Sequence, residues 1–125
     1  MELKRVVVTG LGALTPIGNT VKDYWNGLVN GVSGAAPITY FDATLFKTQF
    51  ACELKNFVAE DFFDRKEARK MDRFTQYALV ASDEAIQDAG LDFTQIDTDR
   101  VGVIWGAGIG GLETFQNEVL YFGSG

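Results

Sequence analysis

The hydrophobic positions of the chain follow two different periods. Continuous apolar runs occur at 4–9 (KRVVVT) and 101–105 (VGVIW), and a glycine follows each run. Such runs are typical of strands buried on both faces of a parallel sheet. Residues 21–29, 74–89 and 112–119 instead carry apolar side chains at intervals of three and four, the period of an amphipathic helix. The alternation of strands and helices predicts an α/β layered fold.

Local signals mark the ends of the first helix. Thr20 is placed to cap it, with Asp23 three residues later, and Gly31 is placed to end it. The apolar stripe of this helix consists of Val21, Tyr24, Trp25, Leu28 and Val29.

The second helix has an apolar stripe that is unusually rich in alanine. Gly90 closes it, and the small side chains predict that another backbone approaches it closely. The stripe consists of Phe74, Tyr77, Ala78, Ala81, Ala85 and Ala89. Between the first two helices, residues 32–64 lack a clear period. We expect short strands at 38–41 and 46–54, with Phe46 and Phe50 as buried anchors.

Composition narrows the function classes. The chain has 125 residues, 46% of them hydrophobic, and a net charge of −6. It can therefore bury a core, and it is a poor partner for nucleic acid or an anionic membrane. No apolar run is long enough to cross a bilayer. The single cysteine, Cys52, fits a reducing cytoplasm and is expected to be a semi-buried thiol. Because histidine is absent, the commonest general base and metal ligand are missing, and we predict no metal site.

A basic segment interrupts this acidic chain. Residues 65–70 (RKEARK) carry four cations and one anion, a net charge of +3. On a helix the four cations would gather on one side, where like charges repel. The segment is either a solvated face screened by Asp64, Glu67 and Asp72, or a docking site for an acidic protein or a phosphate.

A glycine-rich turn follows the second predicted strand. Gly106, Gly108 and Gly111 satisfy the G-x-G-x-x-G spacing between a strand and a helix. This spacing occurs in dinucleotide-binding loops, but the fingerprint also needs an acidic residue about 20 positions further on, and the chain ends before that point. A tight turn between strand and helix explains the glycines equally well.

Four motifs together resemble one known family. They are RVVVTGLGALTPIGN (5–19), SGAAPITYFD (33–42), DRKEARKMDRFTQYAL (64–79) and VGVIWGAGIGGLETF (101–115). In this order they are similar to the N-terminal part of the β-ketoacyl-acyl carrier protein synthases of the elongating type II branch. The Gly-Ile-Gly-Gly form at 108–111 resembles that branch more than type I.

The resemblance implies a thiolase-like α-β-α-β-α architecture, of which residues 1–125 would be a truncated part of the N-terminal half, and a homodimer. The implied reaction is a decarboxylative Claisen condensation of malonyl thioester with an enzyme-bound fatty-acyl chain. The implied partner is acyl carrier protein. No cofactor is implied beyond the 4'-phosphopantetheine that the carrier brings.

The resemblance also assigns residues. The family's catalytic cysteine, in a Thr-Ala-Cys-like elbow, and its two histidines have no counterpart here, since Cys52 lies in QFACEL. The chain alone should therefore be inactive. Gly108 and Ile109 match the gate of the family's acyl pocket. Lys66, Arg69 and Lys70, with Arg65 as a weaker match, correspond to the positions that dock acyl carrier protein. With this resemblance, docking and acyl gating are favoured over a solvated face and a nucleotide loop.

Three alternatives stay open at this point. The first is a polyketide-type ketosynthase or its catalytically silent chain-length partner. The second is a nucleotide-binding oxidoreductase domain that uses the GAGIGG loop. The third is a non-catalytic module that grips an acidic carrier through residues 65–70.

Overall fold

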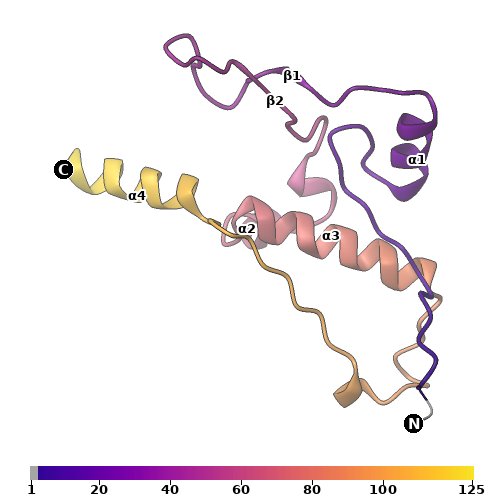
Figure 1. Ribbon diagram of the computed structural model, residues 1–125. Coiled ribbons are helices and arrows are strands. Elements are labelled where there is room, and N and C mark those ends of the chain that lie inside the picture. Colours follow the sequence, from indigo (N-terminus) through magenta and orange to yellow (C-terminus); the bar gives the residue numbers. More distant parts are fainter. Residues whose placement is uncertain (1–2) are drawn as a thin grey trace.

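Helix α3 (Arg73–Asp88) lies at the centre of the computed structural model, which describes residues 3–125 (Figure 1). The other helices of the described residues are α1 (Val21–Val29), α2 (Arg65–Ala68), α4 (Leu112–Gly123) and the short 3-10 helices η1 (Ala59–Asp61) and η2 (Thr98–Arg100). Strands β1 (Ala36–Pro37) and β2 (Phe50–Ala51) form a two-stranded antiparallel sheet, with Ala36 opposite Ala51. Helix α4 projects away from the other elements (Figure 1).

Helix α1 forms as its sequence predicts. The Thr20 hydroxyl accepts a hydrogen bond of 3.1 Å from the Asp23 backbone N–H and donates one of 2.9 Å to the Asp23 carboxylate. These bonds satisfy a backbone donor that the first turn leaves free. Asn30 ends the helix, and Gly31 follows with a φ of 64°. Both predicted ends are confirmed.

The alanine stripe of α3 receives the turn that follows the first apolar run. A β-carbon at Gly12 would overlap the carbonyl oxygen of Ala81, and one at Gly10 would overlap that of Ala85. Glu84, on the same helix, accepts hydrogen bonds of 2.8 Å from the backbone N–H groups of Ala13 and Val21. The predicted close approach of a second backbone is therefore confirmed, and it requires glycine at position 12.

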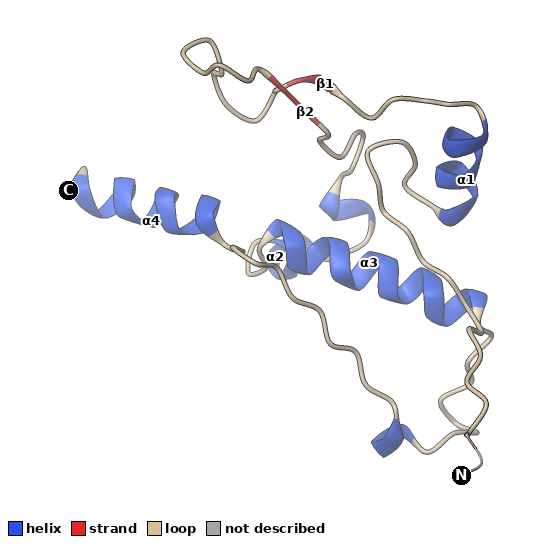
Figure 2. Cartoon of the chain, in the orientation of Figure 1, coloured by secondary structure: helices blue, strands red, loops and turns tan. Residues whose placement is uncertain are grey.

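The two predicted strands at 4–9 and 101–105 are not formed, which corrects the sequence analysis. Neither segment has a strand partner among residues 3–125, and Figure 2 shows both as loops. Val103 and Trp105 line a cavity together with residues of α3, whereas Ile104, between them, is 100% exposed. Val6 is also 89% exposed. A strand exists only through hydrogen bonds to a neighbour, and none of the described residues supplies one here.

The segment between α1 and α2 also differs from expectation. Instead of strands at 38–41 and 46–54, only the two residue pairs of β1 and β2 form a ladder. Phe46 and Phe50 are exposed and anchor no core, although Phe46 meets Phe41 edge to face at 5.4 Å. Cys52 is exposed, not semi-buried.

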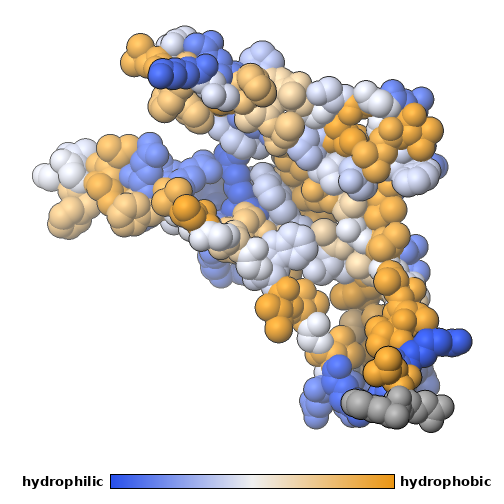
Figure 3. Space-filling model, in the orientation of Figure 1, coloured by the Kyte–Doolittle hydropathy of each residue, from blue (hydrophilic) through white to orange (hydrophobic). Residues whose placement is uncertain are grey.

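The core is small, and much apolar surface is open. Among residues 3–125, the buried hydrophobic residues are all alanines: Ala43, Ala68, Ala78 and Ala81. Large apolar side chains remain exposed along the N-terminal segment, the 101–105 segment and α4, and Figure 3 shows several of these patches. No helix within residues 3–125 combines the length and the hydrophobicity needed to span a membrane.

Candidate functional site

The basic segment 65–70 begins a helix but does not complete it. Helix α2 ends at Ala68, Arg69 is its C-cap, and the Asp64 carboxylate caps its start by accepting a hydrogen bond of 2.8 Å from the Lys66 N–H. The predicted i, i+4 stacking of cations on one continuous helix therefore holds only in part. All four cations are exposed.

One of these cations is already paired. Lys70 lies 2.7 Å from the Glu67 carboxylate, in an exposed ion pair. Within residues 3–125, no carboxylate lies within 4 Å of the charged nitrogens of Arg65, Lys66 or Arg69. An acidic partner could therefore pair with these three charges without displacing Glu67, whereas pairing with Lys70 would compete with it.

The position of α2 depends on a buried amide. Gln76 on α3 is only 8% exposed, and its side-chain nitrogen donates to the carbonyls of Ala68 at 2.8 Å and Met71 at 3.3 Å. The last carbonyls of a helix have no partner further along it, so this amide adds a donor to the Ala68 carbonyl at the end of α2. It also bonds the Met71 carbonyl in the segment that follows. Sequence reasoning placed no role on Gln76, because its partners are identified only by the packing of α2 on α3.

The glycine turn leads from the unpaired 101–105 segment into α4. Gly111 is the N-cap of α4 and has a φ of 74°, a left-handed conformation that favours glycine. Ile109, the predicted gate residue, is 77% exposed, and the space around Gly108 is open. The turn can therefore place the Ile109 side chain over a neighbouring cavity.

That cavity brings the two predicted sites together. It has a volume of about 740 Å³ and is lined by the end of α2, the start of α3, the glycine turn and the start of α4. Arg69 and Ile109, 40 positions apart in the sequence, both line it. Arg65, Lys66, Lys70 and Gly108 do not, so the remaining predicted site residues lie outside its walls.

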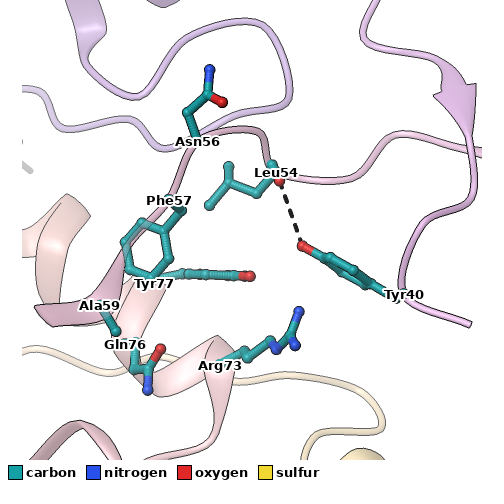
Figure 4. Close-up of a pocket in the computed structure, with 8 residues that line it drawn as sticks. All are labelled: Tyr40, Leu54, Asn56, Phe57, Ala59, Arg73, Gln76 and Tyr77. Carbon is teal, nitrogen blue, oxygen red and sulfur yellow. Dashed lines mark hydrogen bonds between the residues drawn. The ribbon is translucent and has the colours of Figure 1, made fainter. Parts of the chain in front are cut away.

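A second, smaller cavity of about 290 Å³ adjoins the first and shares Tyr40, Arg73, Gln76 and Tyr77 with it (Figure 4). The guanidinium carbon of Arg73 lies 4.3 Å from the centre of the Tyr40 ring, in cation–π geometry. The Tyr40 hydroxyl donates to the Leu54 carbonyl at 3.5 Å.

These groups change one another's ionisation. Desolvation, with a contribution from the Tyr40 hydroxyl, raises the pKa of Tyr77 to about 12. Partial burial lowers the pKa of Arg73. Glu113 and the two tyrosines raise it by more than burial lowers it, so the net change in this pKa is upward. Both side chains therefore keep their neutral-pH charge: Tyr77 is uncharged and Arg73 is a cation.

Comparison with known proteins identifies the family. The model of the β-ketoacyl synthase N-terminal domain matches residues 3–123. The chain belongs to the β-ketoacyl synthase family. The glycine turn is therefore part of a ketosynthase domain, which decides against the dinucleotide-binding interpretation of its spacing.

Curated relatives agree with this assignment. The chain is 52% identical over 118 residues to a protein of Synechocystis sp. named 3-oxoacyl-(acyl-carrier-protein) synthase 2, covering 94% of this chain and 28% of the relative. It is 56% identical over 113 residues to a protein of the same name from Staphylococcus aureus (strain COL), covering 90% of this chain and 27% of the relative. The chain thus spans little more than a quarter of the length of these relatives.

Solved structures give the fold. The ishigamide ketosynthase/chain length factor matches 72% of this chain and 22% of its own, with 39% identity and a TM-score of 0.65. A ketosynthase in complex with a type II polyketide acyl-carrier protein matches 73% of this chain and 23% of its own, with 25% identity and a TM-score of 0.55. The thiolase-like α/β fold class expected from the sequence is confirmed, although the described residues contain only a minimal sheet.

Proposed function

We propose that the complete protein carrying this chain is a β-ketoacyl-acyl carrier protein synthase of type II fatty-acid synthesis. The observation that carries this proposal is the arrangement around the 740 Å³ cavity, where a cation of the docking segment, Arg69, and the gate residue Ile109 line one space. The relatives named 3-oxoacyl-(acyl-carrier-protein) synthase 2 support the same activity.

The proposed reaction has two stages. A cysteine thiolate of the synthase attacks the fatty-acyl thioester, forms an acyl-enzyme thioester and releases the carrier thiol. Malonyl-carrier protein then loses CO2, its carbanion attacks the acyl carbonyl, and the thiolate leaves. An oxyanion hole stabilises the tetrahedral intermediate. The product is a β-ketoacyl chain two carbons longer.

This chain supplies none of the groups that react. It has no histidine, and its one cysteine, Cys52, lies in a loop outside both cavities. The 125 residues alone are therefore expected to be inactive. The contribution we assign to them is carrier docking and shaping of the acyl pocket, in a cytoplasmic homodimer with no cofactor except the carrier's 4'-phosphopantetheine.

Docking is assigned to Lys66, Arg69 and Lys70, with Arg65 at the edge. Three of these four cations have no carboxylate partner within residues 3–125, so an acidic carrier could form ion pairs with them without first breaking an existing pair. Complementary charge of this kind accelerates association and weakens as salt is added. The solved ketosynthase complex, whose partner is an acyl-carrier protein, supports this choice of partner.

Acyl gating is assigned to Ile109, with Gly108 giving the turn room beside it. The side chain is exposed on a turn at the edge of the cavity, and a β-carbon at Gly108 would meet nothing within 4 Å. A change in the turn's conformation can therefore move Ile109 without a clash at Gly108.

A polyketide-type ketosynthase, or its chain-length partner, is the second candidate, because one solved structure above is a ketosynthase/chain length factor and the other is a ketosynthase with a type II polyketide carrier protein. The deciding experiment incubates the complete synthase with acyl-carrier protein and malonyl-carrier protein. Release of CO2 with a single two-carbon extension supports the fatty-acid enzyme. Repeated extension without reduction supports the polyketide enzyme, and no CO2 release refutes condensation.

A further inference from the structure

Three consecutive residues at the start of α3 hold the glycine turn and the first turn of α4. Asp72 accepts a hydrogen bond from the Thr114 hydroxyl. Arg73 forms a two-point ion pair with Glu113, with nitrogen–oxygen distances of 3.1 and 3.2 Å. The ring of Phe74 packs on Gly110, where a β-carbon would lie 2.6 Å from its Cε1. Residues about 40 positions apart are thus joined by three contacts of different chemistry.

These contacts lie at the junction between the glycine turn and α4. Gly111 has a left-handed backbone and caps α4 without a side-chain hydrogen bond. The Asp72 carboxylate lies against it, because a β-carbon at Gly111 would be 3.0 Å from the Asp72 Oδ2. Every residue of α4 is exposed, so α4 has little other packing to fix it. The start of α3 is therefore the main attachment of the turn that carries Ile109.

The same stretch of α3 also holds the docking segment. Gln76, one turn further along α3, bonds the carbonyls of Ala68 and Met71, and Arg69 lies between those two residues. The docking segment and the gate turn are thus fixed to one rigid helix, on two sides of one cavity.

We infer that Asp72 and Arg73 are positioning residues for the gate turn, and that their bonds to Thr114 and Glu113 set which acyl-chain lengths the synthase accepts. This inference rests on the proposed function. In the proposed reaction, neither the Asp72 nor the Arg73 side chain touches the reacting atoms. Both act by fixing Gly110 and Gly111, and through them the position of Ile109.

The test is Thr114→Val in the complete synthase, because valine keeps the shape of threonine and removes the hydroxyl donor. The matched control is Thr94→Val, which removes a similar hydroxyl–carboxylate bond, 2.7 Å to Asp92, in a turn away from the cavity. The readouts are the ratio of kcat/KM for long and short acyl-carrier substrates, and amide hydrogen exchange across 108–114.

We expect Thr114→Val to change the chain-length ratio by about tenfold, which corresponds to one hydrogen bond to a charged group, and to speed exchange at 108–114. Thr94→Val should change neither. Reversing the ion pair with Arg73→Glu and Glu113→Arg together should restore part of the activity that either change alone loses.

Failure of this inference is distinct from failure of the proposed function. If Ile109→Phe alters the chain-length ratio and Thr114→Val does not, the gate stands and the positioning role is wrong. Unchanged exchange at 108–114 in Thr114→Val also refutes the positioning role, whatever the activity. If the wild-type synthase has no condensing activity, the proposed function and the effect on chain length are both refuted. Faster amide exchange at 108–114 in Thr114→Val would then support only the attachment of the glycine turn to α3.

Discussion

The side-chain amide of Gln76 donates a hydrogen bond of 2.8 Å to the carbonyl of Ala68, the last residue of α2. Helix α2 has only four residues, fewer than an isolated helix needs to overcome its nucleation cost. Its geometry therefore depends on tertiary contacts, which include the Gln76 bond from α3 and the packing of α2 beside η1. Because Arg65, Lys66 and Arg69 extend from this short helix and its C-cap, the arrangement of the docking cations depends on a residue that is itself 8% exposed.

Replacing Gln76 should weaken carrier docking more than chemistry. Gln76→Leu removes the side-chain donor of both carbonyls, although the Ala68 carbonyl keeps a bond of 3.3 Å from the Met71 backbone N–H. We expect this loss to cost about 1–3 kcal/mol and to loosen α2. We expect KM for acyl-carrier protein to rise about tenfold, while kcat with a small thioester stays near wild type. Gln49→Leu is the control, because Gln49 bonds two loop carbonyls in the same way at an exposed site. Equal losses with both substrates would instead indicate a folding defect.

Reversing the docking charges should act in a graded way. Arg69→Glu is expected to raise KM for acyl-carrier protein most, by roughly tenfold at low salt. Arg69 has no carboxylate partner within residues 3–125, and it lines the cavity. Lys70→Glu should have less effect, since Lys70 already pairs with Glu67. The exposed Lys47, changed to Glu, controls for net charge. Steady-state kinetics at two ionic strengths measure the effect, and a loss that salt does not diminish would contradict docking.

A larger gate residue should shorten the accepted acyl chain. In Ile109→Phe the added ring enters the cavity that Ile109 lines, so kcat/KM for long chains should fall by about tenfold or more relative to short chains. Ile109→Val, which adds no volume, should keep the wild-type preference. Competition between long and short acyl-carrier substrates measures the ratio, and an unchanged ratio in Ile109→Phe would rule out Ile109 as the gate.

A side chain at Gly12 should destabilise the protein. The β-carbon of Gly12→Ala would overlap the Ala81 carbonyl, which is backbone within α3 and cannot rotate away. We expect a loss of about 2 kcal/mol or more in the free energy of unfolding. Gln87→Ala, at an exposed position of the same helix, should stay within about 0.5 kcal/mol. Thermal unfolding compares the two, and similar values would show that the close approach is not maintained in solution.

The ionisation of Tyr77 should reduce stability at high pH. Its folded-state pKa of about 12 lies above the usual value of 10.0, so folding favours the neutral phenol. That contribution is fully present below pH 10.0 and is lost as pH rises toward 12. The slope of stability against pH in this window should be smaller in Tyr77→Phe. Ultraviolet titration of tyrosinate, with Tyr121→Phe as the exposed control, tests the shift directly.

The sequence by itself determined the features that depend on neighbouring residues. Thr20 and Gly31 mark the ends of α1, and Gly90 follows the end of α3, because caps and left-handed turns are local chemistry. The alanine stripe also predicted the close approach of a second backbone, since small side chains leave room whatever partner arrives. The four motifs at 5–19, 33–42, 64–79 and 101–115 together carried the family resemblance, which the family match over residues 3–123 confirms.

Only the tertiary structure decided which distant residues meet. Gln76 with Ala68, Asp72 with Thr114 and Arg69 with Ile109 come together through the packing of α2, α4 and the glycine turn around α3. No period or motif encodes these pairs. The apolar runs at 4–9 and 101–105 show the converse: their residues favour strands, but a strand also needs hydrogen bonds to a neighbouring segment. Within residues 3–125 no such segment pairs with them, so these two runs form no strand despite their strong local preference.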